Sequence, residues 1–281
     1  YSHTAETPSV RIATKQNMDG AKEFAGTQTD AVTIDGVKYF SNKAIVKDLK
    51  ENTKYYYQVF QNGKWQDAES YTTKSFNSFS FLYVGDPQIG ASKNQTSTEQ
   101  EKMVSAGNEV SSSAADNLAA RNDGYNWNNI LNDAIKDHGD VSFIVSAGDQ
   151  VNAGKNEREY AAYLGADALA SLPVATTIGN HDSVSNQYTL HFNNPNAFSD
   201  TDANYIQGKT DAGTDYYYRY GNTLFMVLDT NNYNCATPEN VMKKAISENK
   251  DAKWRIVVFH QDIYGSGYDH SDSDGMVLRT Q

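Results

Sequence analysis

The stretch Leu172–Asp182, with the sequence LPVATTIGNHD, decides the fold of this chain. Its first part, up to Ile178, is short, mostly apolar and rich in β-branched residues, a pattern that predicts a buried strand. A glycine follows, and then Asn180, His181 and Asp182, whose side chains offer oxygen and imidazole donors. Open α/β sheets bind their ligands just beyond the C-terminal ends of strands. We therefore expect a ligand site at the end of this strand.

Other buried strands are predicted in the chain, and each is followed closely by a side chain that can bind a hard metal ion. A recurring placement of this kind is harder to obtain by chance than a single motif. The sequence thus predicts one site built at the ends of several strands. The strands and their candidate ligands are Phe79–Val84 with Asp86, Val141–Ser146 with Asp149, and Trp254–Phe259 with His260.

These residue types suit the hydrolysis of phosphate esters. A phosphate ester repels nucleophiles, and two metal ions about 3.5–4 Å apart can activate water and clamp the oxygens of an in-line displacement. Hard ions prefer oxygen and imidazole donors, so Asp149 could bridge both ions and Asn180 could add a neutral carbonyl. We interpret His181 as a catalytic group that faces the phosphoryl oxygens or the leaving group. Asp182 is expected to fix the tautomer of His181.

The order Gly-Asp, Gly-Asp, Gly-Asn-His-Asp, Val-x-x-His resembles the calcineurin-like metallophosphoesterase superfamily, and within it the purple acid phosphatase branch. The resemblance runs from about Phe79 to the C-terminus. It implies an α/β (α+β) fold, a two-sheet mixed β sandwich flanked by helices, and a site for two divalent or trivalent ions (Fe, Zn or Mn). It further implies that Asp86 and Asp149 hold the first ion, that Asp149, Asn180 and His260 hold the second, and that His270 faces the substrate.

The chain departs from the family pattern in its ligand set. Asn152 stands where the purple branch has a tyrosine, so no tyrosinate colour is expected. Gln88 stands where many members have a ligand histidine. Both side chains are retained as weaker candidate metal ligands. The Gly-His-x-His motif that closes the family's site does not occur before Gln281, so we expect an incomplete catalytic domain and slow or absent hydrolysis by this chain alone.

Residues 1–75 show a different sequence pattern. Short segments in which apolar and polar residues alternate are separated by Gly, Asn and Asp turns. The segment Leu49–Tyr57 resembles the tyrosine corner of fibronectin type III domains, in which a turn leads into a strand that begins with Tyr. Few strands precede this corner, so we expect an incomplete sandwich with an unpaired edge. The predicted strands are Val10–Thr14, Ala31–Ile34, Lys38–Phe40, Ala44–Val46, Tyr55–Phe60 and Ser70–Thr73.

Plant and bacterial purple acid phosphatases carry such a domain ahead of the catalytic one. The resemblance therefore implies a fibronectin type III-like domain at 1–75 and a metallophosphoesterase domain at 78–281, incomplete at its C-terminus. Gly90–Gly124 is interpreted as an insertion, partly helical around Thr98–Leu118. Apolar spacing and capping patterns predict the remaining elements: helices at Asn128–His138 and Glu157–Ala170, one capped by Thr237, a hairpin of Tyr216–Tyr220 and Leu224–Leu228, and a helix start in Ser273–Arg279.

Composition and net charge argue against some classes of binding partner. The 281 residues carry a net charge of −11, which argues against binding to nucleic acid or an anionic membrane. No apolar run approaches the length of a membrane span. Cys235 is the only cysteine, so the chain cannot form an intrachain disulfide. The 19 tyrosines, with abundant Asn, Thr and Ser, are typical of bacterial extracellular proteins, and we expect a secreted or cell-surface location.

Two classes of function fit the sequence. The first is an enzyme, a metal-dependent phosphoesterase that acts on small phosphorylated substrates, either as an acid phosphatase or as a phosphodiesterase or nucleotidase of the same superfamily. The second is a non-catalytic binding or adhesion protein on a degenerate phosphoesterase scaffold. Five converging polar residues favour the enzyme, whereas Gln88 and Asn152 keep the second class open. The substrate, the metal and the oligomeric state stay open.

Overall fold

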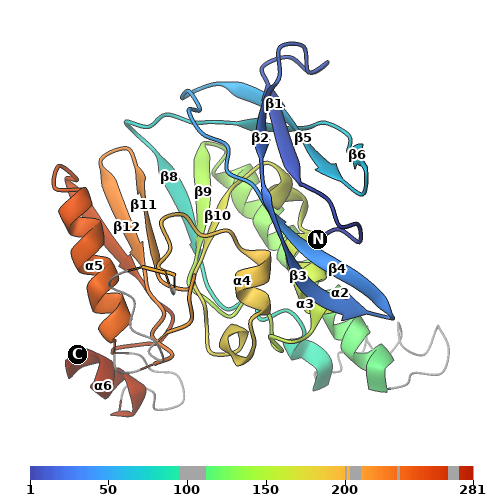
Figure 1. Ribbon diagram of the computed structural model, residues 1–281. Coiled ribbons are helices and arrows are strands. Elements are labelled where there is room, and N and C mark those ends of the chain that lie inside the picture. The colour runs from blue at the N-terminus through green and yellow to red at the C-terminus, as the bar shows by residue number, and fades with distance from the viewer. Residues whose placement is uncertain (95–111, 200, 203–209, 233–234, 265–271, 281) are drawn as a thin grey trace.

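A computed structural model describes residues 1–94, 112–199, 201–202, 210–232, 235–264 and 272–280. It divides into an all-β N-terminal part and a larger part in which strands alternate with helices (Figure 1). None of the helices in these ranges is long and apolar enough to cross a membrane. The fold is thus a mixed α/β fold preceded by an all-β domain, as the sequence predicted.

The N-terminal part contains a five-stranded and a two-stranded sheet and, in residues 1–73, no helix. Within residues 1–94, β2 pairs only with β1 and is an edge strand of the larger sheet, while the incompleteness of the sandwich stays a prediction. The predicted strand Ala44–Val46 is wrong, because these residues have no strand pairing. Strand β2 was missed since KEFA has little apolar alternation. The strands are β1 (Ser9–Ala13), β2 (Lys22–Ala25), β5 (Lys54–Gln61), β6 (Lys64–Trp65) and β7 (Glu69–Thr72) in the larger sheet, and β3 (Thr27–Ile34) and β4 (Val37–Lys43) in the smaller.

Tyr55 makes the hydrogen bond expected of a tyrosine corner. It stands near the start of β5, its side chain is 8% exposed, and its hydroxyl accepts a hydrogen bond of 2.8 Å from the backbone N–H of Lys50. A buried tyrosine hydroxyl needs such a partner. This contact ties the turn before β5 to the sheet, as a tyrosine corner does, and the fibronectin type III character of the domain stays a prediction.

The larger part is built on two three-stranded sheets. The first has the order β10-β9-β8 and is parallel; the second has the order β11-β12-β13, with β11 antiparallel to β12 and β12 parallel to β13. The predicted strands and the predicted hairpin are confirmed, with shifts at their ends. The strands are β8 (Ser80–Val84), β9 (Val141–Ser146), β10 (Val174–Thr176), β11 (Tyr216–Tyr220), β12 (Thr223–Val227) and β13 (Trp254–Val258).

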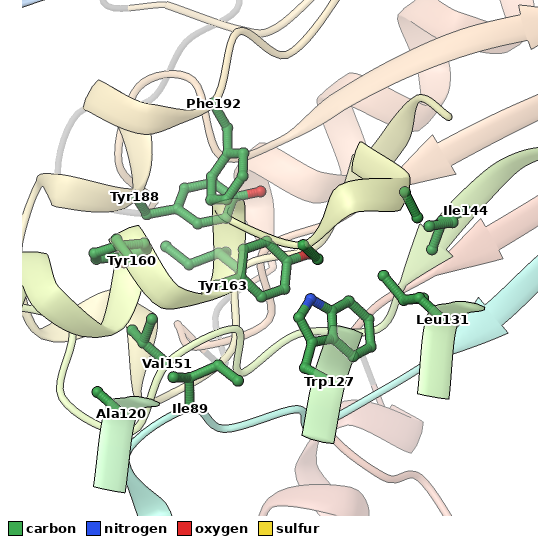
Figure 2. Close-up of a cluster of buried hydrophobic side chains, with 13 residues drawn as sticks. Ile89, Ala120, Trp127, Leu131, Ile144, Val151, Tyr160, Tyr163, Tyr188 and Phe192 are labelled. Atoms are coloured by element: carbon green, nitrogen blue, oxygen red, sulfur yellow. The ribbon is translucent and has the colours of Figure 1, made fainter. Parts of the chain in front are cut away.

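Strand β9 shows how the layers stack, because every residue in it is buried. Successive side chains point to opposite faces of a strand. Phe143 and Val145 pack with Phe225 and Val227 in the core between the two sheets. Ile144 points the other way, into a core that it shares with aromatic residues of the helices and loops (Figure 2).

Helices cover the outer faces of the sandwich (Figure 1). Helices α2 and α3 lie on the side of β10, and α5 lies beyond β11 and β12. The two-sheet mixed sandwich flanked by helices is therefore confirmed. The helices are η1 (Ala91–Asn94), α2 (Ser112–Asp137), α3 (Glu157–Leu164), η2 (Asp167–Ala170), η3 (Asp182–Val184), α4 (Gln187–His191), α5 (Ala236–Glu248) and α6 (Asp274–Thr280).

Helix α2 begins well before Asn128, where the sequence predicted its start. Gly124 lies inside it, and a Cβ there would lie 2.9 Å from Cβ of Ala162, so this glycine permits close packing of α2 on α3.

The predicted cap Thr237 is wrong. Helix α5 starts two residues earlier than predicted, with Cys235 at its N-cap in a left-handed conformation (φ 52°). The helix start in Ser273–Arg279 is confirmed, whereas most of the predicted helix Thr98–Leu118 lies outside the described residues.

Candidate metal centre

The loops after β8 and β9 run side by side and carry the first two candidate ligands. The backbone N–H of Asp86 donates to Gly148 O (3.2 Å), and that of Gln88 donates to Asp149 O (2.9 Å). Asp86 and Asp149 both have left-handed backbones, with φ of 50° and 49°. Such conformations cost free energy and cluster at functional sites. The two turns aim both carboxylates toward the same end of the sandwich.

Two glycines let the loops approach closely. A Cβ on Gly179 would lie 2.0 Å from Oδ1 of Asp149, so no other residue fits there without moving the carboxylate. Gly148 has a φ of 116°, and a Cβ there would lie 2.5 Å from Nδ1 of His260. Gly148 and Gly179 are therefore required by the packing of the site itself, whereas a Cβ on Gly85, the glycine before Asp86, would make only an ordinary contact with Ala147 at 3.4 Å.

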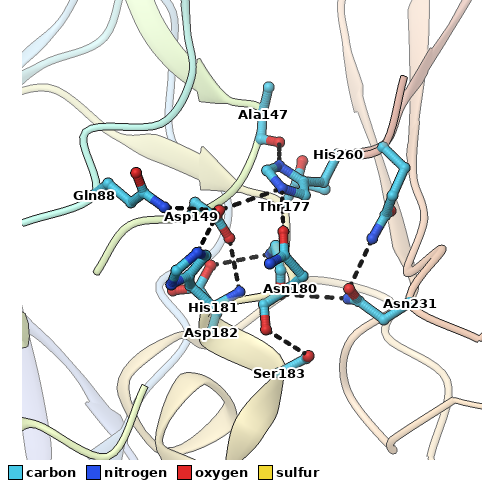
Figure 3. A network of polar contacts seen from close by, with 12 residues as sticks. Gln88, Ala147, Asp149, Thr177, Asn180, His181, Asp182, Ser183, Asn231 and His260 are labelled. Carbon is cyan, nitrogen blue, oxygen red and sulfur yellow. Dashed lines mark hydrogen bonds and ion pairs between the residues drawn. The ribbon is translucent and has the colours of Figure 1, made fainter. Parts of the chain in front are cut away.

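Three of the candidate ligands, Asp149, Asn180 and His260, lie close together at the ends of three strands (Figure 3). One ligand atom each from Asp86, Asp149 and His260 lies within 4.8 Å of the others. Nε2 of His260 lies 2.9 Å from Oδ1 of Asn180 and 3.4 Å from Oδ2 of Asp149. The sequence-based expectation that these side chains converge agrees with this geometry.

His260 is oriented for this role by its other ring nitrogen. Nδ1 lies 3.0 Å from the carbonyl oxygen of Ala147, to which it can only donate, so Nε2 is the atom directed at the other ligands. Burial lowers the pKa of His260, but the hydrogen bond to Asp149 and its negative charge outweigh burial and raise the pKa to about 9. The surroundings of Nε2 therefore favour a positive charge, which a metal ion would also supply.

His181 lies beside this cluster. Its backbone N–H donates to Oδ1 of Asp149 (2.9 Å), and its Nε2 is 4.0 Å from Oδ2 of the same carboxylate. Its Nδ1 lies 2.6 Å from the carbonyl oxygen of Asn152. His181 is thus fixed at both its backbone and its ring, with Nε2 on the side of the candidate ligands.

The predicted role of Asp182 is wrong. Asp182 is fully buried, and its Oδ2 accepts hydrogen bonds from the backbone N–H groups of Gly179 (3.0 Å) and Gln150 (3.3 Å). It therefore ties the loops after β9 and β10 together, while the backbone of Asn152 takes the position beside Nδ1 of His181. Burial raises the pKa of Asp182 to about 7, partly offset by the hydrogen bond from Gly179.

The structure treats the three remaining candidate site residues, Gln88, Asn152 and His270, differently. Nε2 of Gln88 donates to Oδ2 of Asp149 (3.5 Å), so Gln88 presents its amide nitrogen rather than the predicted oxygen. Asn152 contacts His181 through its backbone, and the ligand role of its side chain stays a prediction. His270 lies outside the described residues.

Asn231 belongs to the site and was missed from the sequence. Its Nδ2 contacts the carbonyl oxygen of Gly179 (3.4 Å) and donates to Oδ1 of Asp229 (2.9 Å), and its Oδ1 accepts from Gln261 (2.8 Å). It thereby connects the loops after β10, β12 and β13. The available signal was its position shortly after β12, the same placement that marked the other candidates.

Comparison with known families agrees with the fold and the site. The model of the calcineurin-like phosphoesterase family matches residues 79–278, and that of the purple acid phosphatase N-terminal domain matches residues 1–73. The chain belongs to the calcineurin-like phosphoesterase family, whose members of the purple acid phosphatase type use a dinuclear metal centre. A search of curated proteins found no significant match.

One solved structure shows the same fold. A purple acid phosphatase from seeds of yellow lupin (Lupinus luteus) superposes with a TM-score of 0.55 at 14% sequence identity, over 95% of this chain and 48% of that one. The structure of PhoD gives a TM-score of 0.49 at 12% identity, over 99% of this chain and 61% of that one. The chain thus spans about half the length of the lupin enzyme.

Proposed function

We propose that this protein is a metal-dependent phosphoesterase of the acid phosphatase type that hydrolyses small phosphate esters. The observation that carries the proposal is the meeting of His260, Asn180 and Asp149 at one point, with Asp86 beside them. Two carboxylates, an amide oxygen and an imidazole are the donor set that hard or borderline ions take. Family membership supports the same class of reaction.

The donor set fits the metal centre that the family implies. Asp86, Asp149, Asn180 and His260 would hold the ions. When bound, two ions supply Lewis acidity to the phosphoryl group and lower the pKa of water. With a net charge of −11, the chain gains no general attraction for anionic substrates, so the charge that holds the phosphate is local.

His181 would contact the substrate from the side of Asp149. Because Nδ1 donates to a carbonyl oxygen, Nε2 is the ring atom left to face the substrate, and when the ring is the imidazolium Nε2 can donate to a phosphoryl oxygen or give its proton to the leaving group. Asp182 and Asn231 would keep the loop that carries Asn180 and His181 in place, since both bind the backbone of Gly179.

Metal binding and turnover test this proposal. We expect the chain to bind Zn²⁺ or Mn²⁺ and the natural full-length protein to hydrolyse p-nitrophenyl phosphate, with both properties lost in Asp149→Asn. The part of the chain that the structure describes offers four candidate ligands, which are few for two ions, so slow turnover by this chain stays a prediction. Metal binding without turnover by the full-length protein would favour the non-catalytic alternative.

We also propose a secreted or cell-surface location in a bacterium, supported by composition alone.

A further inference from the structure

The peptide group between Asn152 and Ala153 is hydrogen-bonded on both sides. Its carbonyl oxygen, from Asn152, lies 2.6 Å from Nδ1 of His181, and its N–H, from Ala153, donates to Oε2 of Glu159 at 2.7 Å. Glu159 is on helix α3 and is only 4% exposed. A carboxylate, a peptide group and the imidazole of His181 therefore form one continuous chain of hydrogen bonds.

Capping of helix α3 does not account for this contact by itself. Asn156 is the N-cap and Glu159 stands three residues later, where a glutamate usually accepts from the backbone N–H of the cap residue. Here the N–H of Asn156 donates to Ala153 O instead (2.7 Å). Oε1 of Glu159 accepts from the side chain of Asn156 (2.8 Å), and Oε2 reaches back to Ala153. One oxygen thus supports the cap and the other supports the peptide group that faces His181.

The carboxylate of Glu159 is also fixed from the side of the first ligand loop. Gly90 packs directly on it, and a Cβ at Gly90 would lie 2.4 Å from Cδ and Oε1 of Glu159. Asn152 in turn donates its backbone N–H to Ile89 O (2.9 Å). Glu159 therefore sits where the loop after Asp86 meets the loop after Asp149, and it has little freedom to move.

We propose that Glu159 is a positioning residue that sets the tautomer of His181 through the Asn152–Ala153 peptide group. A negative acceptor on the N–H side polarises a peptide group and makes its carbonyl oxygen a stronger acceptor, because hydrogen bonds in a chain reinforce one another. The Asn152 carbonyl then holds the proton of His181 on Nδ1. Nε2 stays free to face the substrate, and Glu159 takes the part that the sequence assigned to Asp182.

This inference rests on the proposed function, in which His181 faces the substrate, but its test does not need turnover. Long-range ¹H–¹⁵N NMR of the metal-free chain reports which ring nitrogen of neutral His181 carries the proton, and His181→Asn assigns the signal among the six histidines. We expect the Nδ1–H form in the native chain. In Glu159→Ala we expect the ratio of Nε2–H to Nδ1–H to rise roughly threefold to tenfold, and in Glu159→Gln by less, because a neutral acceptor remains.

Asn156→Ala is the matched control, since it removes the cap and the second contact of Glu159 but leaves the bond to Ala153. It should lower stability without changing the tautomer of His181. An Nε2–H tautomer in the native chain would overturn the inference whatever the variants do. So would an unchanged ratio in Glu159→Ala or, if that variant does not fold, in Glu159→Gln, and so would an equal shift in the control. An Nδ1–H tautomer in a full-length protein without turnover would reject the proposed function alone.

Discussion

Nε2 of His260 lies 2.9 Å from Oδ1 of Asn180, although the two residues are 80 positions apart and follow strands of different sheets. Asn180 follows the end of the parallel sheet, and His260 follows the end of β13 in the second sheet. The two sheets are packed face to face, so their strand ends form one rim. The candidate metal centre therefore depends on the packing of the two sheets. A substitution that shifts one sheet should also change the distances to ligands carried by the other.

Removal of a ligand should weaken metal binding without unfolding the chain. In His260→Ala we expect the affinity for Zn²⁺ or Mn²⁺ to fall by at least roughly 10- to 100-fold, because even residues that only support a ligand have effects of this size. Titration calorimetry measures the change. His138→Ala, at an exposed position after α2, is the control and should bind metal as the native chain does. Equal affinities for the two variants would remove His260 from the ligand set.

The tyrosine corner should contribute to the stability of the N-terminal part. Tyr55→Phe removes the hydroxyl that accepts the part-buried hydrogen bond from Lys50 N–H, which should lower the free energy of unfolding by about 0.5–1.5 kcal/mol. Tyr56→Phe, at the next position of β5, is the matched control and should change it by less than about 0.5 kcal/mol. Denaturant unfolding of the two variants gives the comparison, and equal stabilities would contradict the role of the corner.

The parts of the structure that could be predicted from sequence are those set by local patterns. Strand β9 was predicted with its observed bounds, because a short, nearly continuous apolar run is typical of a strand that is buried on both faces. The glycines and ligands that follow the strands were found for the same reason. The ligands after β8, β9 and β10 could be expected to converge, since the ends of parallel strands meet at one edge, whereas the approach of His260 depends on how the second sheet packs on the first.

The errors concern partners that only tertiary packing decides. Asp182 follows His181 in the sequence, but its side chain turns into the core toward Gly179 and Gln150. The group that reaches Nδ1 of His181 is a backbone carbonyl, and a backbone group leaves no mark in the residue pattern. Glu159 likewise looked like an ordinary first-turn acid of α3, because its contact with Ala153 depends on how the preceding loop folds back.

Asp215 should make stability depend on pH. It is 1% exposed, and burial raises its pKa from 3.8 to about 7, although hydrogen bonds from Thr210 and Asp229 N–H offset part of this effect. Between these values the folded chain binds the proton and the unfolded chain does not, so the free energy of unfolding falls as the pH rises from about 4 to 7 and then levels off. The size of the fall is on the order of 2–4 kcal/mol.

Denaturant unfolding of the metal-free chain at several pH values tests this sign. Asp215→Asn should reduce the fall between pH 4 and 7, because an amide does not titrate there. Asp35→Asn, in an exposed turn of the β3–β4 hairpin, should leave the slope as it is in the native chain. A native slope that persists in Asp215→Asn would assign the pH dependence to other groups.

Gly179→Ala should damage the metal centre through a single methyl group. The new Cβ would lie 2.0 Å from Oδ1 and 2.4 Å from the backbone nitrogen of Asp149, so both the carboxylate and its loop must shift. Overpacking of this kind costs about 1–3 kcal/mol of stability, and the displaced carboxylate should lower metal affinity by at least about tenfold. Gly139→Ala is the control, because its nearest atom, Ile135 O, would be 3.7 Å away. Thermal unfolding and metal titration separate the two effects, and native metal affinity in Gly179→Ala would show that Asp149 does not need its observed position to bind the ion.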